Sequence, residues 1–183
     1  DSHARKRARA ELWLEVDTPL VGLIGRFDPQ KNHAGFFEAA GLLHRHMPQV
    51  HFVLAGQGID IGNAALMQAI TQAGVLANTH LLGLRNDIPE LMAALDVLAS
   101  SSSYGEAFPN VLGEAMASGV PCAVTDVGDS AYIVGDAGRV ASLGDMAGLA
   151  AALEDLLSLP LAKRTALGEC ARARVAEHFE IGR

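Results

Sequence analysis

The hydrophobic and polar positions of this chain follow two alternating patterns. Apolar runs predict strands at 20–25, 50–55, 96–99 and 122–125, the first of them buried on both faces of the sheet, and shorter strands are predicted at 79–83 and 138–140. Apolar residues at helical spacing predict helices between them, at 33–46, 64–73, 88–94, 145–158 and 161–180. This alternation predicts an α/β fold with a doubly wound, mostly parallel sheet and helices on both faces.

The first nineteen residues differ from the rest of the chain. Residues 3–15 read as a polar helix with four basic side chains, and a break follows at 17–19. We interpret 1–19 as a linker with a solvated lead-in helix, the alternative being a membrane-binding or partner-binding patch. Residues 20–183 are then one domain.

Composition narrows the class of protein. The 183 residues are enough for one core, and half of them are hydrophobic, so the chain should be soluble and globular. The net charge of −7 argues against nucleic-acid binding, which needs a basic footprint. Two cysteines without metal-ligand spacing favour reduced thiols in the cytoplasm, and the scattered histidines predict no metal site. No apolar run approaches the ~20 residues of a membrane helix.

Two cations follow the first predicted strand. Arg26 comes directly after it, and Lys31 lies at the start of the next helix. Ligands of open parallel sheets bind at the carboxyl ends of strands, so both cations are placed to bind a diphosphate.

A helix start at Pro109 has the features of an anion site. Proline suits the first helical position, and its predicted cap, Phe108, has no side-chain oxygen. The N–H groups of Asn110 and Val111 then lack an acceptor, and the helix dipole adds positive potential. The sequence therefore predicts that a diphosphate binds here.

Two carboxylates flank this helix start. Glu106 precedes it, and Glu114 lies about 7 Å beyond Pro109 along the helix axis, given a rise of ~1.5 Å per residue. That is about the distance from a diphosphate to the ribose of its nucleotide. A carboxylate only accepts hydrogen bonds, so it suits hydroxyls and repels phosphate. We predict that Glu114 binds the ribose and Glu106 a sugar.

Glycines after the second strand invite comparison with dinucleotide-binding motifs. Gly56 and Gly58 match the first two positions of G-x-G-x-x-G, but Ile61 replaces the third glycine and no Walker lysine follows. A nicotinamide-dependent dehydrogenase is therefore not favoured. The two glycines are expected to allow a sharp turn or close approach of the backbone to a ligand.

The stretch G-E-A-F-P-N-V-L-G-E-A-M-A-S-G-V-P, which contains Glu106 and Glu114, resembles the signature of the group 1 retaining, nucleotide-sugar-dependent glycosyltransferases. The pattern G-R-F-x-x-x-K around Arg26 and Lys31 is also similar to that family. The resemblance covers nearly the whole chain and implies a Rossmann-like, donor-binding C-terminal half of a GT-B fold. It implies transfer of a sugar from a nucleoside diphosphate, with uridine as the base, in lipopolysaccharide or other surface-polysaccharide synthesis.

The resemblance also supplies a set of site residues and partners. It implies that the loop at Leu84 and Arg85 contacts the base through its backbone. Arg26, Lys31 and Glu106 are predicted to act in catalysis. The residues predicted to bind the nucleotide sugar are Gly25, Arg26, Lys31, Gly56, Gly58, Leu84, Arg85, Glu106, Ala107, Phe108, Asn110, Val111 and Glu114. No cofactor and no metal ion is expected.

The chain begins at Asp1 rather than methionine, so it looks like a piece of a longer protein. The implied partner is an N-terminal acceptor-binding domain, without which this piece should transfer no sugar. The expected location is cytoplasmic, with peripheral association at the inner face of the membrane open. The alternatives are a nucleotide-sugar 2-epimerase-like domain and a non-catalytic nucleotide-binding module.

Overall fold

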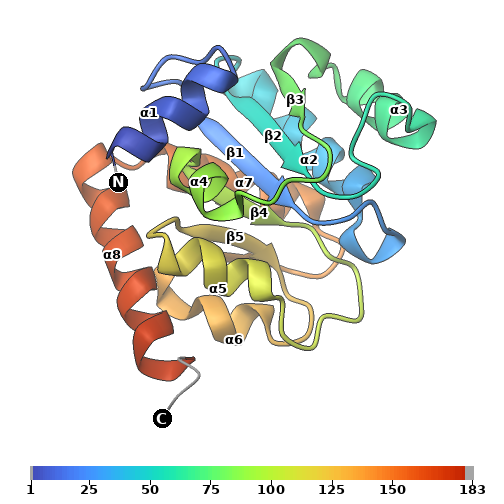
Figure 1. Ribbon diagram of the computed structural model, residues 1–183. Coiled ribbons are helices and arrows are strands. Elements are labelled where there is room, and N and C mark those ends of the chain that lie inside the picture. Colours follow the sequence, from blue (N-terminus) through green and yellow to red (C-terminus); the bar gives the residue numbers. More distant parts are fainter. Residues whose placement is uncertain (1, 180–183) are drawn as a thin grey trace.

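The computed structural model describes residues 2–179 and contains one sheet of six parallel strands (Figure 1). The strand order is β3-β2-β1-β4-β5-β6. The strands are β1 (Leu20–Ile24), β2 (His51–Ala55), β3 (Thr79–Leu81), β4 (Val97–Ser100), β5 (Cys122–Thr125) and β6 (Arg139–Ala141). The helices are α1 (Ser2–Glu11), α2 (His33–His46), α3 (Ala64–Ala73), α4 (Ile88–Ala94), α5 (Asn110–Ala117), α6 (Ser130–Val134), α7 (Met146–Ser158) and α8 (Leu161–His178). Single 3-10 turns lie at η1 (Pro29–Lys31), η2 (Leu76–Asn78) and η3 (Gly135–Ala137).

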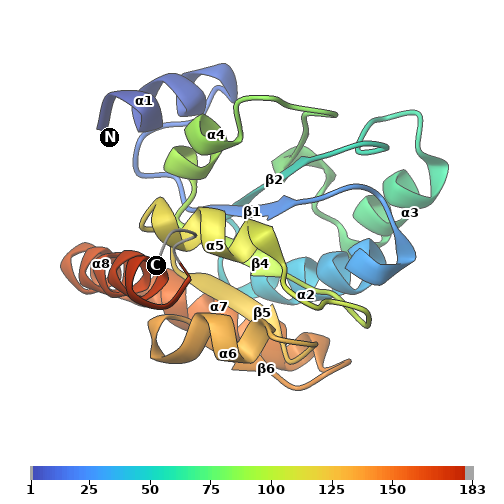
Figure 2. The same ribbon diagram turned by 60° about the horizontal axis from the view of Figure 1, so that its bottom comes forward.

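Helices cover both faces of the sheet. Figures 1 and 2 show α2 and α7 on one face and α4, α5 and α6 on the other. Alternate strand residues supply the two cores, because successive side chains of a strand point to opposite faces. Val21 and Leu23 pack in the core under α2, α3 and α7, whereas Leu20 packs in the core under α4, α5 and α8. The doubly wound fold expected from the sequence is therefore confirmed.

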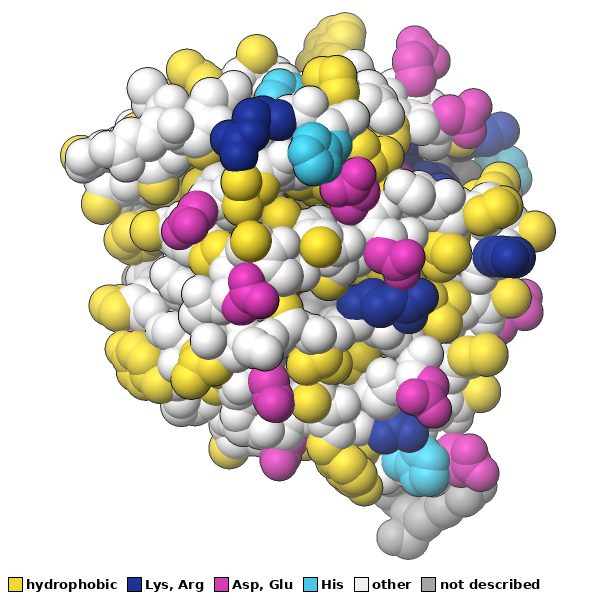
Figure 3. Space-filling model, turned by 180° about the vertical axis from the view of Figure 1, so that it is seen from behind, with side chains coloured by type: hydrophobic (Ala, Val, Ile, Leu, Met, Phe, Trp, Pro, Cys, Tyr) yellow, Lys and Arg dark blue, Asp and Glu magenta, His cyan; other side chains and the backbone are white. Residues whose placement is uncertain are grey.

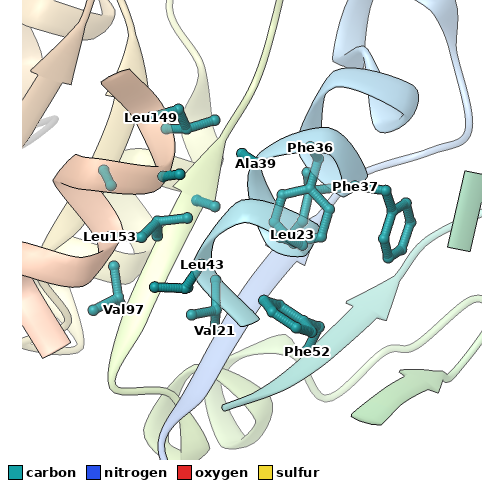
Figure 4. Close-up of a cluster of buried hydrophobic side chains, with 14 of the residues drawn as sticks. Val21, Leu23, Phe36, Phe37, Ala39, Leu43, Phe52, Val97, Leu149 and Leu153 are labelled. Atoms are coloured by element: carbon teal, nitrogen blue, oxygen red, sulfur yellow. The ribbon is translucent and has the colours of Figure 1, made fainter. Parts of the chain in front are cut away.

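Aromatic and branched side chains fill the core under α2. Phe36 and Phe37 of α2 are fully buried, and the Phe36 ring meets Phe52 of β2 edge-on at 6.0 Å between centroids (Figure 4). Leu149 and Leu153 of α7 complete this layer beside β4. Each such side chain contributes about 1.5–3 kcal/mol when fully buried, so this layer fixes α2 and α7 against the sheet.

Most predicted elements begin or end within two residues of their predicted bounds. The helices α2, α3 and α4 match, and β1 and β3 end one and two residues earlier than predicted. The short helix α6 follows Asp129 and was not predicted. The closing helix was expected to reach Glu180 but ends at His178; position 180 lies outside the described residues.

The interpretation of the first helix as solvated is wrong for the side that carries Arg9, although Lys6, Arg7 and Glu11 are exposed. Arg9 is fully buried, and its guanidinium donates to the Ala94 carbonyl at 3.0 Å and to Asp96 Oδ2 at 2.8 Å. Arg5 donates to the other oxygen of Asp96 at 2.8 Å, and the Leu20 N–H donates to Oδ2 at 2.9 Å. This paired carboxylate fixes α1 to the amino ends of β1 and β4. The predicted boundary at residue 19 stays a prediction.

Helix α8 packs across the carboxyl ends of α5 and α6 (Figure 1). Gly168 lies so close to Gly119 that a Cβ at position 168 would overlap the Gly119 carbonyl. Arg172 Nε donates to the Ala117 carbonyl at 3.0 Å, and Arg174 Nε donates to the Ile133 carbonyl at 2.8 Å. Cations at helix carboxyl ends are favourable, so α8 stabilises both shorter helices.

The rear face of the molecule, as seen in Figure 3, carries acidic and basic side chains interspersed with apolar ones. A groove of about 630 Å³ lies there between α2 and α3, lined by Gly35, Gly41 and Ala73 among others. It runs along the outer side of α2, from Asn32 to Arg45, rather than between the strand ends, so we place the functional site elsewhere. Among the described helices, none has the length and apolar character needed to cross a membrane.

Candidate functional site

The strands β1 and β4 separate at their carboxyl ends, and we call this separation the parting of the sheet. These two strands pair only at Val21–Val97 and Gly22–Leu98, and beyond that point β1 continues beside β2 and β4 beside β5. In the order β3-β2-β1-β4-β5-β6, successive strands are added on one side of β1 up to β3 and on its other side from β4 onward, and open α/β sheets bind ligands at such a switch point. A small hollow occupies the parting, and its lining is Leu23, Ile24, Lys31, Ala99, Ser100, Ser101, Ser102 and Val111.

An ion pair crosses the rim of this hollow. Lys31 Nζ, from the β1–α2 connection, donates to Glu106 Oε1, from the β4–α5 connection. Ser102 Oγ donates to the same oxygen at 2.7 Å. Glu106 is 7% exposed and the Lys31 side chain 20% exposed, so both charges are largely buried and paired. The structure thus brings together two residues that the sequence placed in the site.

The loop that carries Glu106 is held on both sides. Ser101 Oγ donates to the Lys31 carbonyl at 2.8 Å, and the Ser103 N–H donates to the Gln30 carbonyl at 2.9 Å. On the other side, Thr125 Oγ1 of β5 donates to the Ser102 carbonyl at 2.6 Å. The serine loop is therefore a fixed connection between β1–α2, β4 and β5.

The start of α5 borders the hollow and has no side-chain cap. The N-cap is Pro109 rather than Phe108, one residue later than predicted, and it has no side-chain hydrogen bond. Within the described residues, the Leu112 N–H bonds the Pro109 carbonyl at 2.9 Å, whereas no acceptor faces the N–H groups of Asn110 and Val111. Val111 lines the hollow, so this positive helix end faces Lys31.

Arg26 lies outside the ion pair of Lys31 and Glu106. Its side chain is 60% exposed, and Nε donates to Asp28 Oδ2 at 3.1 Å. Hydrogen bonds from the Gln30 N–H and then from Arg26 hold the pKa of Asp28 below its usual value. The predicted contact of Arg26 with a diphosphate stays a prediction. Gly25 lies close to Lys31, because a Cβ at position 25 would lie 3.6 Å from the Lys31 side chain.

The loops after β2 and β3 lean against the loop after β1. Gly56 has a φ of 151°, and a Cβ there would overlap the Gly25 carbonyl, so the close backbone approach is to the protein itself. The Gly56 N–H bonds the Gly83 carbonyl at 2.7 Å, and the Phe27 N–H bonds the Gln57 carbonyl at 2.8 Å. Gly58 also has a positive φ, 76°. Four strand ends therefore form one continuous edge.

The remaining predicted site residues lie at the margin of this edge. Leu84 is 75% exposed, and the Arg85 guanidinium bonds Asp87 and Glu11, so that side chain is directed toward α1. Ala107 and Phe108 are exposed in the approach to α5. Glu114 is exposed on α5, and no described residue pairs with it. The roles of these residues stay predictions.

His33 is a buried group that the sequence reasoning missed. It is 3% exposed, its ring lies 5.1 Å from that of Phe27, and neither ring nitrogen has a partner among the described residues. Burial, and then the nearby charge of Lys31, lower its pKa to about 4. The imidazole is therefore neutral at physiological pH.

Sequence reasoning also missed the hydroxyls around Glu106. The partners of Ser101 and Thr125 are remote in sequence, whereas Ser102 bonds Glu106 only four positions away. Serines directly after a buried strand of a parallel sheet were the available signal. Among the described residues, no three His, Cys, Asp or Glu side chains are placed to bind one metal ion.

An open parallel sheet of this strand order, with the uncapped start of α5 and the Lys31–Glu106 pair at its switch point, defines a Rossmann-like domain. The family model described as "Glycosyl transferases group 1" matches residues 18–159. The chain therefore belongs to the group 1 glycosyltransferases.

Individual relatives agree with this family. The chain is 30% identical to the lipopolysaccharide core biosynthesis glycosyltransferase LpsE of Rhizobium meliloti over 181 residues, covering 93% of this chain and 51% of LpsE. It is 32% identical over 125 residues to the Escherichia coli UDP-Gal:alpha-D-GlcNAc-diphosphoundecaprenol alpha-1,3-galactosyltransferase, covering 67% of this chain and 32% of that enzyme. The chain thus spans about a third to a half of the curated relatives' length.

A solved relative matches the whole fold. HepE of Anabaena, determined in complex with UDP-glucose, superposes with a TM-score of 0.85 at 27% identity, covering 98% of this chain and 50% of HepE. The chain thus corresponds to one half of a two-domain GT-B glycosyltransferase, and the expected fold and family are both confirmed.

Proposed function

We propose that this chain is the donor-binding half of a retaining glycosyltransferase that takes its sugar from a uridine diphosphate sugar. The observation that carries the proposal is the meeting of Lys31, Glu106 and the uncapped start of α5 at the parting of β1 and β4. Positive and negative groups stand side by side there, as a ligand with a diphosphate and a polyhydroxylated sugar requires. The choice of uridine rests on the UDP-glucose complex of HepE and the UDP-Gal donor of the galactosyltransferase.

Each group has a role in the proposed reaction. Lys31, aided by Arg26, neutralises the charge that develops on the departing diphosphate. The N–H groups of Asn110 and Val111 add donors that are already oriented. Glu106 accepts hydrogen bonds from sugar hydroxyls, and its charge stabilises the cationic sugar-like transition state.

Glu114 completes the proposed donor site. It lies one turn further along α5 and binds the ribose diol. The proposal requires no metal ion, because the lysine, the arginine and the helix dipole supply the positive charge. Attack by the acceptor on the sugar face from which the diphosphate leaves is the retaining outcome that the family implies.

The biological setting follows from the relatives. LpsE is named for lipopolysaccharide core synthesis, and the galactosyltransferase for a diphosphoundecaprenol-linked acceptor. We propose the same broad class of role, the building of a cell-surface glycan on the cytoplasmic side of the membrane.

Titration calorimetry with uridine diphosphate tests the site. Lys31→Ala should weaken binding at least tenfold, or about 1.4 kcal/mol, because it removes a charged hydrogen-bond donor from the diphosphate. Glu114→Ala should weaken it about five- to tenfold through loss of the ribose contact.

The matched controls are Lys163→Ala and Glu38→Ala, which remove exposed charges on α8 and α2 away from the hollow. Both controls should bind as the unchanged chain does. Equal affinity in all five proteins would remove the site assignment.

A non-catalytic nucleotide-binding module is the competing function. It predicts that Glu106→Gln in the intact protein leaves any sugar transfer untouched, whereas our proposal predicts a loss of at least a hundredfold in kcat. Radiolabelled sugar transfer by the two intact proteins distinguishes these functions.

A further inference from the structure

We infer that Ser102 is a positioning residue that orients Glu106 toward the sugar of the donor, and that the Thr125 hydroxyl holds Ser102 in place. This inference rests on the proposed function. It assigns a role to two hydroxyls that the sequence places in a loop and in a strand.

The two oxygens of Glu106 are used differently. Both protein donors, Ser102 Oγ at 2.7 Å and Lys31 Nζ, are on Oε1. No described residue donates to Oε2. A carboxylate oxygen accepts about two hydrogen bonds, so Oε1 is fully used and Oε2 remains for a ligand hydroxyl. The carboxylate is thereby oriented as well as charged.

Of the two donors, Ser102 is the one with a fixed position. A lysine reaches its partner through four rotatable bonds and carries three N–H donors, so its ammonium can follow a diphosphate. Ser102 is 1% exposed, and the position of its hydroxyl oxygen depends on a single rotatable bond. The serine therefore holds the orientation of Glu106 when Lys31 engages the ligand.

The backbone on either side of Ser102 is held as well. Thr125, itself 1% exposed, donates Oγ1 to the Ser102 carbonyl at 2.6 Å and lies 3.4 Å from that of Ser100. Further along, Gly128 packs on the Glu106 carbonyl, and a Cβ at that position would overlap it. The chain of contacts runs from β5 through Ser102 to the carboxylate.

This arrangement predicts a selective effect. The Ser102 hydroxyl donates its hydrogen bond to Glu106, so its loss should weaken only the part of binding that depends on the sugar. Loss of Lys31 should weaken both parts, because Lys31 serves the diphosphate too. A merely structural serine would weaken the two parts together.

Calorimetry first measures the affinity of the unchanged chain for uridine diphosphate and for UDP-glucose, UDP-galactose and UDP-N-acetylglucosamine. The nucleotide sugar that binds most tightly is then compared with uridine diphosphate in every variant. Ser102→Ala should reduce affinity for that nucleotide sugar at least fivefold and leave affinity for uridine diphosphate within twofold. Thr125→Val should act in the same direction more weakly, and Thr125→Ser, which keeps the hydroxyl, should restore binding.

The control is Ser103→Ala, which removes the neighbouring hydroxyl that lies 3.4 Å from the Pro29 carbonyl and does not contact Glu106. It should change neither affinity. Equal losses for both ligands in Ser102→Ala, no loss at all, or no tighter binding of any sugar nucleotide by the unchanged chain would overturn this inference. Failure of the unchanged chain to bind uridine diphosphate would overturn the proposed function itself.

Should Ser102→Ala not fold, as judged by its thermal transition, the Thr125→Val and Thr125→Ser pair decides the question. The inference is supported if Thr125→Val loses sugar-dependent affinity and Thr125→Ser keeps it. Equal behaviour of the two variants contradicts it.

Discussion

Lys31 and Glu106 are 75 positions apart in the sequence, yet they form one buried ion pair. Their proximity follows from topology, because each residue follows a strand whose carboxyl end lies at the same parting of the sheet. The sequence indicated both residues through their places after strands. It did not indicate that they would bond each other, since a pairing through space has no local pattern.

The environments of Ser102, Thr125 and His33 could not be predicted from the sequence. Ser102 is an ordinary loop residue and Thr125 an ordinary strand residue in sequence, and only the three-dimensional approach of β4 and β5 brings the Thr125 hydroxyl to the Ser102 carbonyl. His33 looked like the first residue of a helix, which it is, but the Phe27 ring covers it. Burial from a remote side chain cannot be read from helical spacing.

His33 makes the stability of the chain depend on pH. Its folded pKa of about 4 lies below the unfolded value of 6.5, so the unfolded chain binds the proton first. Unfolding free energy should therefore fall as pH drops from about 6.5 to about 4, by up to about 1.4 kcal/mol per unit from this residue. In His33→Phe, urea unfolding midpoints should show a shallower slope over that range.

The control for this prediction is His178→Phe at a half-exposed position. It should keep the slope of the unchanged chain. An His33→Phe slope equal to that of the unchanged chain would contradict the buried, neutral imidazole.

Helices and strands were predictable where the pattern was strong and the element long. Apolar runs indicated the central strands β1, β2, β4 and β5, because strands buried on both faces leave no polar alternation. The short α6, with five residues, has too few positions to show a helical period. The buried side of the first helix was not predicted, because the partner of Arg9 is Asp96, far along the chain.

The crossing of α8 over α5 predicts opposite effects for two glycines within helices. Replacing glycine by alanine normally stabilises a helix by about 0.5–1 kcal/mol. Gly113→Ala should do so, because a Cβ there has no neighbour within 4 Å. Gly168→Ala should instead destabilise by about 1–3 kcal/mol, because the new methyl group overlaps the Gly119 carbonyl.

Urea unfolding of both variants measures the two signs. The pair controls for helix propensity, since both substitutions are Gly→Ala inside a helix. A stabilising Gly168→Ala would mean that α8 does not rest on Gly119.

At the scale of the whole molecule, the chain corresponds to about half of HepE, which has a further half beyond the region that this chain matches. Exposed apolar side chains stand along the carboxyl edge of the sheet, among them Phe27, Tyr104 and Phe108. We propose that the acceptor binds mainly to the second domain.

Residues 1–183 alone should therefore bind uridine diphosphate and transfer no sugar. The intact protein, tested with the same UDP-sugar and a lipid-linked acceptor, should transfer it. Mass spectrometry of the acceptor gives the readout. Transfer by residues 1–183 alone would show that no second domain is needed.

The parting of β1 and β4 has a consequence for how such a protein can change over time. The opening is made by the path of the main chain, so it persists whichever side chains surround it. New preferences for a sugar or an acceptor can then arise by exchanging rim residues one at a time, while the ladder of main-chain hydrogen bonds below is left intact. A ligand site at this division of the sheet would therefore tolerate exchanges at its rim without loss of the fold.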